Sequence, residues 1–269
     1  MDIIWITSES DWRLPWPVAL QQCWAYGQAM ARLGARVRHV LLRQGGQVIA
    51  AAQMLERRGL RVINRPPGQP GPLLRRLARF PGLTLCTGAV GHGFVPLVTP
   101  RFHAEWDLRP DPADLRRGMQ GKWRNRLRRG ETLPIREGPA GVMMDLAARC
   151  DTLARQRGFR ALPPSFLAGW EGGRLVLHWS PGGRLAAGIV VLIHGQGATY
   201  HCGWTSAEGR AAQAHATMLW QAALVLRGQG VQRLDLGAVD ATNPGLARFK
   251  LGTGAALVSL GPASLILPG

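Results

Sequence analysis

Three side chains between residues 200 and 240 have the chemical types that proton transfer requires. Tyr200 lies in an expected strand, where its phenol could protonate a leaving group or could only pack. His215 begins an expected amphipathic helix, where a neutral imidazole could act as a base or could only be a polar residue of the first turn. Asp240 follows an expected strand at its C-terminal end, the usual position of a ligand in an α/β sheet, or it caps the next helix. These residues predict acid–base chemistry, and each structural alternative stays open.

A basic segment in the middle of the chain has the composition of a phosphate-binding surface. Residues 116–129 read RRGMQGKWRNRLRR and include no acidic side chain. Asp111 and Pro112 suit the N-cap and first turn of a helix that would reach residue 130. Guanidinium groups match phosphate oxygens bidentately. The alternative is the solvated face of an amphipathic helix. The candidate phosphate ligands in this segment are Lys122, Arg124 and Arg128.

The composition is that of a globular protein that can bury a sizeable core. Of the 269 residues, 46% are hydrophobic and only 18% are charged, which excludes a disordered chain. The length fits one large domain or two small ones. No run of about 18 apolar residues occurs, so we expect no membrane-spanning helix, and the N-terminus is not typical of a signal peptide. We therefore expect a cytoplasmic protein.

The net charge indicates the kind of partner to expect, and the cysteines indicate the kind of compartment. The formal net charge is +17, which favours anionic partners such as nucleic acid, nucleotide diphosphates or an acidic membrane surface. Almost all of the positive charge is arginine, and a GC-rich coding sequence would produce the same bias. The four cysteines lie far apart in the sequence, with no CxxC pair and no neighbouring base. This spacing predicts no structural zinc site, disulfide framework or cysteine nucleophile, and it favours a reducing compartment.

The order of the expected elements is that of a mixed α/β protein. In the first half, a helix over residues 18–33 precedes a hairpin over 36–57 with a glycine turn. In the second half, a strand–strand–strand–helix–strand–helix–strand succession predicts an antiparallel sheet that continues as a parallel one. Alternation places Arg233 and Asp235 on the same face of their strand, where they could pair. The expected elements of the second half span residues 175–179, 185–193, 198–204, 211–227, 231–236, 244–250 and 256–260.

Several stretches together carry a resemblance to a known family. Residues 230–237 read GVQRLDLG, and residues 243–254 read NPGLARFKLGTG. They follow a strand that ends in Gly203-Trp204 and a helix built on Leu219, Trp220 and Ala223. The opening helix and hairpin at 21–55 and the basic KWRNRLRR at 122–129 match as well. With these elements the sequence resembles the FemABX-like transferases of the GNAT (Gcn5-related N-acetyltransferase) superfamily.

The resemblance implies a fold and a reaction class. The fold would be α/β, with two fused GNAT-like subdomains of mixed central sheets flanked by helices. Residues 1–140 would form a degenerate subdomain and residues 141–269 the catalytic one. Fem-type proteins attach amino acids from aminoacyl-tRNA to an amine, whereas other relatives are acyl-CoA N-acyltransferases. The implied acceptor is an amine-bearing small molecule or peptide, and no metal is implied.

One departure from the family pattern favours aminoacyl-tRNA as the donor. Acetyl-CoA users carry a Gly-rich pyrophosphate loop, whereas residues 208–215 here read EGRAAQAH, with one glycine. Arg210 in this stretch is a candidate phosphate ligand, and free N–H groups at the helix start could still hold a phosphate of an acyl-CoA donor. A protein of a different class, a non-catalytic module that binds tRNA or another nucleic acid, stays as an alternative.

The matched R-F-K segment supplies the remaining candidates. Lys250 is one of two lysines in the chain and lies where the family places a lysine near the acyl-transfer site. The resemblance implies that it stabilises the negative charge that develops on the acyl oxygen; the alternative is a surface cation near a helix end. Arg248 falls on another face and could bind a phosphate or be exposed to solvent.

Overall fold

The computed structural model describes residues 1–159 and 161–268 and divides into two compact units. The first comprises Met1–Phe102, Gly169–Glu171 and Ser259–Gly269, and the second His103–Ala168 and Gly172–Val258. A division at residue 140 therefore falls inside the second unit. The expected division into a degenerate and a catalytic subdomain stays a prediction. Gly269, the last residue of the expected catalytic subdomain, lies outside the described residues. No helix among the described residues is long and apolar enough to cross a membrane.

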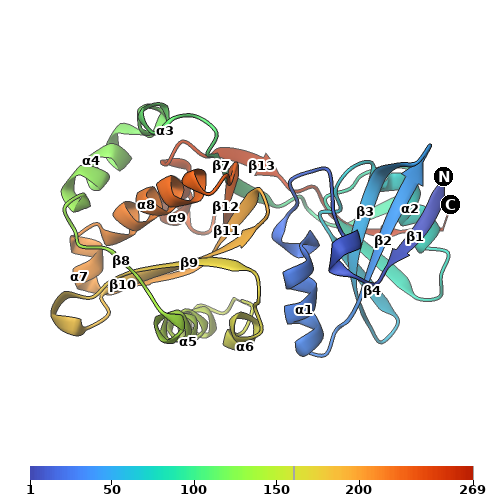
Figure 1. Cartoon of the computed structure of the whole chain (residues 1–269), viewed down its shortest axis with the longest axis horizontal. Helices are drawn as coiled ribbons and strands as arrows, with labels where there is room; N and C mark the ends of the chain where they lie inside the picture. The colour runs from blue at the N-terminus through green and yellow to red at the C-terminus, as the bar shows by residue number, and fades with distance from the viewer. Residues whose placement is uncertain (160, 269) are drawn as a thin grey trace. The chain divides into compact units, whose positions relative to one another are not determined.

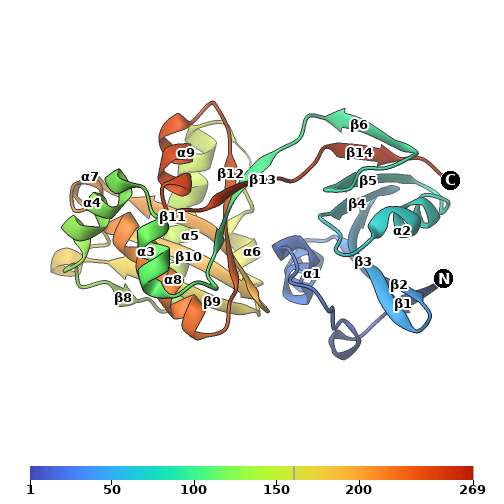
Figure 2. The same ribbon diagram turned by 90° about the horizontal axis from the view of Figure 1, so that it is seen from above.

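The first unit is built on a seven-stranded sheet in the order β1-β2-β3-β4-β5-β14-β6. The hairpin between β2 and β3 turns through Gly45 and Gly46, whose φ angles of 57° and 81° suit a two-residue hairpin loop. The last strand of the chain, β14, inserts antiparallel between β5 and β6 (Figure 2). The elements are β1 (Asp2–Ile6), α1 (Trp24–Arg32), β2 (Arg36–Gln44), β3 (Gln47–Arg57), β4 (Leu60–Asn64), α2 (Pro70–Leu77), β5 (Leu83–Thr87), β6 (Phe94–Val98) and β14 (Ala263–Ile266), with 3-10 turns at Glu9–Asp11 and Leu20–Gln22.

Alternation along β2 gives this sheet two apolar faces. Val40 and Leu42 pack with the leucines of α2 in one core cluster, whereas Leu41 packs with Trp12 in another. On the Leu41 side, Trp24 of α1 stacks on His39 with ring centroids 4.2 Å apart. Period-two burial thus lets one strand support a helix on each face.

The second unit is built on a seven-stranded sheet in the order β13-β7-β12-β11-β10-β9-β8. The pairs β8–β9, β9–β10 and β10–β11 are antiparallel, whereas β11 and β12 are parallel. The elements are β7 (Phe102–Asp107), α3 (Pro112–Gly118), α4 (Gly121–Gly130), β8 (Arg136–Glu137), α5 (Ala140–Gln156), α6 (Pro164–Ala168), β9 (Gly173–Trp179), β10 (Ala187–His194), β11 (Gly197–Thr205), α7 (Ala207–Ala211), α8 (Ala214–Gly228), β12 (Arg233–Val239), α9 (Pro244–Leu251) and β13 (Ala256–Ser259), with a 3-10 turn at Pro181–Gly183.

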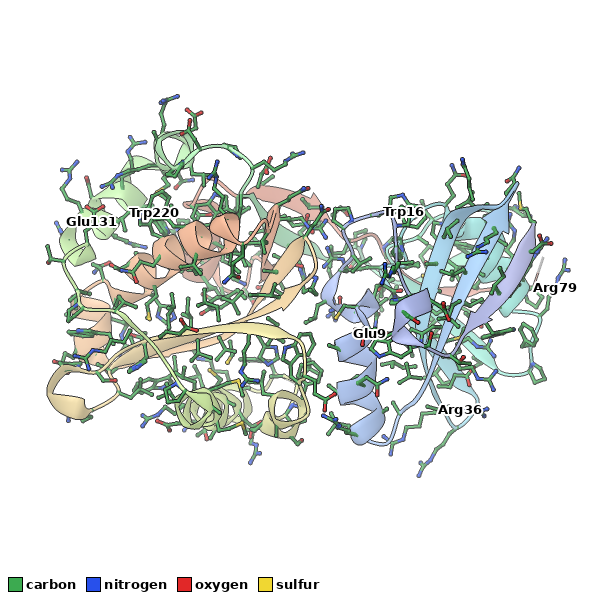
Figure 3. The ribbon with its side chains drawn as sticks, viewed as in Figure 1. Glu9, Trp16, Arg36, Arg79, Glu131 and Trp220 are labelled. Atoms are coloured by element: carbon green, nitrogen blue, oxygen red, sulfur yellow. The ribbon has the colours of Figure 1, made fainter. Side chains whose placement is uncertain are left out.

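Helices cover both faces of this second sheet. Figure 1 shows α5 and α6 on one side of β9 and β10, and α8 on the other. On the α8 side, buried residues of α3, α4 and α8 form one core cluster with alternate residues of the strands. Trp220 of α8, labelled in Figure 3, belongs to this cluster. The two mixed sheets flanked by helices confirm the expected fold class.

Three expected elements differ from the structure. The helix over 112–130 is two helices, because Met119 and Gln120 are extended, with ψ of 147° and 146°. The backbone N–H of Gln120 donates instead to Gly252 O at 2.9 Å. The helix over 211–227 is split at Gln213, whose φ is 59°. The helix over 18–33 begins only at Trp24, because residues 20–22 form a 3-10 turn.

Candidate functional site

The centre of the second sheet is where two parallel strands separate. Among the described residues, β11 and β12 pair at Gly197–Thr199 with Arg233–Asp235 and no further. Both strands continue beyond these pairs, to Thr205 and Val239. In open α/β sheets, ligands bind beyond the carboxyl ends of strands and where neighbouring strands diverge. The candidate residues Tyr200 and Asp240 both follow the point of separation.

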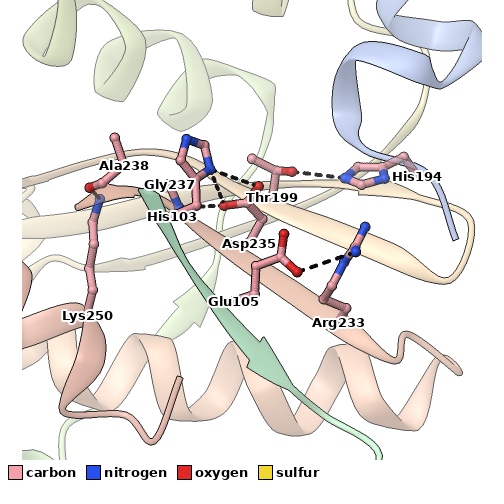
Figure 4. A network of polar contacts seen from close by, with 9 residues as sticks. All are labelled: His103, Glu105, His194, Thr199, Arg233, Asp235, Gly237, Ala238 and Lys250. Carbon is pink, nitrogen blue, oxygen red and sulfur yellow. Dashed lines mark hydrogen bonds and ion pairs between the residues drawn. The ribbon is translucent and has the colours of Figure 1, made fainter. Parts of the chain in front are cut away.

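Lys250 lies in the last turn of α9, beside the end of β12. The sequence starts α9 with Asn243, whose Oδ1 accepts the Leu246 N–H at 3.1 Å, and with Pro244 in the first turn. The Lys250 side chain is buried, and its Nζ donates to Ala238 O at 2.7 Å (Figure 4). Burial lowers the pKa of this ammonium group, whereas the charges of Asp235 and Asp240 act in the opposite direction. Lys250 is therefore an inward-facing amine rather than a surface cation.

Gly237 lies next to Lys250 and has a backbone conformation that favours glycine. Its φ of 81° is in the left-handed region, which favours glycine. A Cβ atom at this position would lie 3.5 Å from Lys250 Nζ. The Gly237 N–H donates to Asp235 Oδ1 at 2.8 Å, so Gly237 contacts Asp235 as well as lying close to Lys250.

Asp235 and His103 form a pair across two neighbouring strands, β12 and β7. Leu234 and Leu236 point into the core, and Asp235 points to the opposite face, where it is also buried. His103 Nδ1 lies 2.9 Å from Asp235 Oδ1 and 3.1 Å from Oδ2 (Figure 4). An ionised carboxylate only accepts hydrogen bonds, so Nδ1 carries the proton and Nε2 of a neutral ring presents a lone pair. This is the arrangement of an oriented general base.

Sequence reasoning did not single out His103. No local pattern marks this histidine, because its partner lies 132 positions away in the sequence. On the same strand as Asp235, Arg233 Nη1 forms an ion pair with Glu105 of β7 at 3.4 Å. The alternation of Arg233 and Asp235 onto one face is a usable indication, because two charged side chains on one face of a buried strand require polar partners nearby.

Tyr200 and His215 lie together on the α8 side of the sheet. Tyr200 Oη is 3.2 Å from His215 Nε2, and His215 occupies the first turn of α8. Burial raises the pKa of the phenol and lowers that of the imidazole to about 4. At neutral pH the phenol is therefore protonated and the imidazole is neutral, so the O–H donates to the ring nitrogen. The His215 ring also packs on Phe249 of α9, with centroids 6.3 Å apart.

Asp240 is an exposed residue that organises the loop before α9. Its Oδ1 accepts the backbone N–H groups of Thr242 at 2.8 Å and Asn243 at 3.2 Å, and the Thr242 hydroxyl. The hydrogen bonds from Thr242 lower the pKa of the carboxyl. Asn243 is the N-cap of α9, so Asp240 supports the turn rather than the helix.

The basic segment is anchored to α9 and presents cations to solvent. Asp111 caps α3 as expected, accepting the Asp114 N–H at 2.8 Å. Trp123 Nε1 donates to Phe249 O at 3.0 Å, which attaches α4 to α9. Arg124 turns back to donate to the carbonyls of Arg117 and Met119, at 3.0 and 2.7 Å. It therefore satisfies the end of α3 and is not a free phosphate ligand in this conformation.

Other cations of α4 are available to a ligand. Four exposed side chains form no ion pair within the described part of the chain: Lys122, Arg126, Arg128 and Arg129. Two further candidates are also exposed but hold local carbonyls. Arg210 donates to Thr205 O at 3.0 Å, and Arg248 donates to Pro244 O at 3.2 Å.

No metal site is evident in the described residues, which include no group of three or more His, Cys, Asp or Glu side chains suited to a metal ion. No protein-family profile matches the sequence, and a search of curated proteins finds no match.

Solved structures, in contrast, share the fold. The chain is similar to FemX, with a TM-score of 0.79 and 14% identity, over 100% of this chain and 98% of that one. It is similar to a conserved protein of unknown function from Bacteroides thetaiotaomicron, with a TM-score of 0.62, 13% identity and 90% of each chain covered. A C-terminal domain assigned to a lysylphosphatidylglycerol synthetase of Agrobacterium fabrum matches with a TM-score of 0.56 and 14% identity, over 93% and 88% of the two chains. The fold expected from the FemABX-like resemblance is confirmed along the whole chain.

Proposed function

We propose that this protein is an amide-forming transferase that moves an aminoacyl or acyl group to an amine. The observation that carries the proposal is the buried amino group of Lys250, held by Ala238 O where β11 and β12 separate. The FemX-like fold along the whole chain supports the same reaction class. The C-terminal domain assigned to a lysylphosphatidylglycerol synthetase, which shares the fold, supports an aminoacyl group as the one transferred.

Each residue of the site has a separate role in the proposed acyl transfer. The amine must be neutral and must lie against the acyl carbon, and the tetrahedral oxyanion needs hydrogen-bond donors. One N–H group of the Lys250 ammonium donates to Ala238 O, and the other two are available to donate to the oxyanion. His103 Nε2, oriented by Asp235, takes the proton that the attacking amine releases. Tyr200 and His215 are hydrogen-bonded to each other on the opposite face of the sheet from Asp235, so we assign them no proton transfer in this reaction.

We favour aminoacyl-tRNA over acyl-CoA as the donor. Two observations around the stretch where CoA users carry their phosphate loop support this choice. The Ser206 hydroxyl accepts the Gly209 N–H at 3.1 Å and so occupies the start of α7. The end of α4 lies against the first turn of α8, where a Cβ at Gly130 would be 2.3 Å from Thr217 Oγ1. The exposed cations of α4 suit an RNA backbone instead.

The first experiment is a calorimetric titration of the nucleic-acid-free protein with CoA and with acetyl-CoA at near-physiological salt. We expect no saturable heat from either ligand. One-to-one binding with a dissociation constant of about 1–100 µM would establish acyl-CoA as the donor instead. This measurement comes before tRNA binding, because a basic protein binds tRNA non-specifically.

The second experiment separates an enzyme from a binding module. Turnover is measured as the transfer of labelled amino acid from aminoacyl-tRNA to each of a panel of small amines. We expect Lys250→Ala to lower turnover by about 100-fold or more while tRNA affinity is kept. Arg174→Ala, at an exposed position of β9, is the control for surface charge. Turnover that is equal in wild type and Lys250→Ala would overturn the assigned mechanism, and tRNA binding without turnover in the wild type would leave a non-catalytic module.

The cellular location follows from the donor as part of the same proposal. Both donors are cytoplasmic metabolites, and the four cysteines are free in the structure. We therefore propose a cytoplasmic transferase whose acceptor is an amine-bearing small molecule or peptide.

A further inference from the structure

A cavity of about 180 Å³ lies on the α5 and α6 side of the second sheet, away from Lys250. Its wall is mostly apolar, with Leu162 and Leu167 among the lining residues. Two of the four cysteines line it as well: Cys150 from α5 and Cys202 from β11. Neither cysteine has a role in the proposed acyl transfer.

The fold brings the two cysteines together through an irregularity in β11. In the pairing of β10 with β11, Val190 lies opposite Cys202 and Val191 opposite Tyr200, so His201 is an extra residue in the ladder. As a result, consecutive residues His201 and Cys202 both line the cavity. The His201 ring stacks on Phe166 of α6 at 5.5 Å, which holds this part of the strand in place.

The two thiols are chemically different from each other. The Cys150 sulfur is in hydrogen-bond contact with the Cys202 thiol and with the backbone N–H of Gly203. These hydrogen bonds favour the thiolate and lower the pKa of Cys150, although burial acts in the opposite direction. The same contact and burial raise the pKa of Cys202. Cys150 thus has the character of an attacking thiol and Cys202 that of its resolving partner.

The other two cysteines differ on each of these points. Cys23 and Cys86 are buried in the first unit, and burial raises the pKa of each thiol to about 12. Cys150, in contrast, is partly exposed and borders a cavity. Cys23 and Cys86 are therefore an internal reference for unreactive thiols in the same molecule.

We propose that Cys150 and Cys202 are a dithiol modification site that reacts with low-molecular-weight disulfides and closes to an intramolecular disulfide. In the first step, the Cys150 thiolate attacks one sulfur of the small disulfide and releases one small thiol. In the second, Cys202 loses its proton and attacks the Cys150 sulfur, which releases the other small thiol. The protein loses two hydrogen atoms, and the small disulfide is reduced to two thiols.

Closure would change the cavity directly. Both cysteines line it, so a bond between them would join α5 to β11 within the wall of the cavity. The bond would also restrain β11 two residues after Tyr200. This site stands on its own and does not depend on the proposed transferase activity.

The test uses the purified full chain with oxidised glutathione as the probe. Samples are alkylated without denaturation and analysed by peptide mass spectrometry. In the wild type, we expect the peptides that contain Cys150 and Cys202 to be found linked to each other by a disulfide, with no glutathione attached. We expect Cys202→Ser to retain one glutathione on Cys150, because no resolving thiol follows, and Cys150→Ser to leave Cys202 unmodified.

Cys23 and Cys86 supply the internal control. Their alkylation rates in the native protein should be lower than that of Cys150 by about tenfold or more. A stable glutathione adduct on wild-type Cys150, or native alkylation of all four cysteines at one rate, would overturn the proposal. Because the wild-type peptide map decides the result alone, a poorly folding serine variant does not prevent the test.

Discussion

His103 Nδ1 lies 2.9 Å from Asp235 Oδ1, although 132 positions separate the two residues. They meet because their strands, β7 and β12, are neighbours in the second sheet. Asp235 is held in turn by the Gly237 N–H at 2.8 Å, so the carboxylate is fixed before it orients the imidazole. A buried carboxylate that fixes a histidine tautomer is a common way to prepare a general base.

We expect His103→Gln to lower the rate of acyl transfer by about 100-fold at neutral pH. The glutamine cannot take the proton of the attacking amine, whereas substrate binding is kept. The measurement is kcat and KM for aminoacyl-tRNA turnover across a pH series. Glu105→Gln is the matched control, because Glu105 lies on the same strand and pairs with Arg233. If both variants lost the same share of the transfer rate, the effect would come from a disturbed β7 strand and not from the missing imidazole.

The pair of Tyr200 and His215 makes stability depend on pH. Burial lowers the pKa of His215 from 6.5 to about 4 in the folded protein. Above pH 6.5 the ring is neutral in both states and no stability is lost. As pH falls from 6.5 to 4, the unfolded chain takes up a proton that the folded one does not, so stability decreases by up to about 3 kcal/mol.

Urea unfolding at pH 5 and pH 7.5 checks this expectation. His215→Asn should flatten the pH dependence in part, and the remainder should come from His201, whose pKa burial lowers to about 4 as well, and from His39 and His178, whose pKa values burial also lowers. His92→Asn, at an exposed position, should leave the pH dependence of the wild type unchanged. A His215→Asn protein with the wild-type pH dependence would contradict the assignment.

Gly203 leaves the space that the Tyr200–His215 pair needs. A Cβ at this position would lie 1.9 Å from Tyr200 Oη and 2.6 Å from His215 Nε2. We therefore expect Gly203→Ala to lower the free energy of unfolding by about 1–3 kcal/mol, because the two rings must move. In the control Gly141→Ala, the new Cβ meets nothing within 4 Å, and a helical alanine replaces a glycine in α5.

Thermal and urea unfolding of the two glycine variants distinguish crowding from a general effect of the substitution. Gly141→Ala should be as stable as the wild type or more stable, by about 0.5–1 kcal/mol. If Gly203→Ala were equally stable, the close packing of the two rings would not hold in solution.

The exposed cations of α4 should determine the salt dependence of tRNA binding. We expect the combined variant Lys122→Gln, Arg126→Gln, Arg129→Gln to bind tRNA more weakly and to reduce the slope of log K against log salt by about one for each phosphate that no longer meets a cation. Filter binding over a salt series measures this slope. Arg57→Gln, an exposed arginine of the first unit, is the control. An unchanged slope would make the α4 surface a solvated face and nothing more.

Several elements were predictable because their determinants are local. The hairpin over residues 36–57 follows from its glycine turn, and α9 begins at the expected Asn243-Pro244. Residues 112–130 were expected as one helix because their periodicity is continuous. The break at Met119-Gln120 depends on a hydrogen bond to Gly252, which local periodicity does not contain.

By itself, the sequence determined the types of the elements, the capping of α3, the start of α9, the basic segment, the FemABX-like resemblance and the placement of Lys250 near a helix end. Each of these depends on residues within a few turns of one another, so spacing and side-chain type suffice. The tertiary structure alone decided that β14 returns to the first sheet, that His103 meets Asp235 and that Cys150 meets Cys202. These contacts follow from strand order and helix packing, which the whole chain sets by burying its apolar faces together.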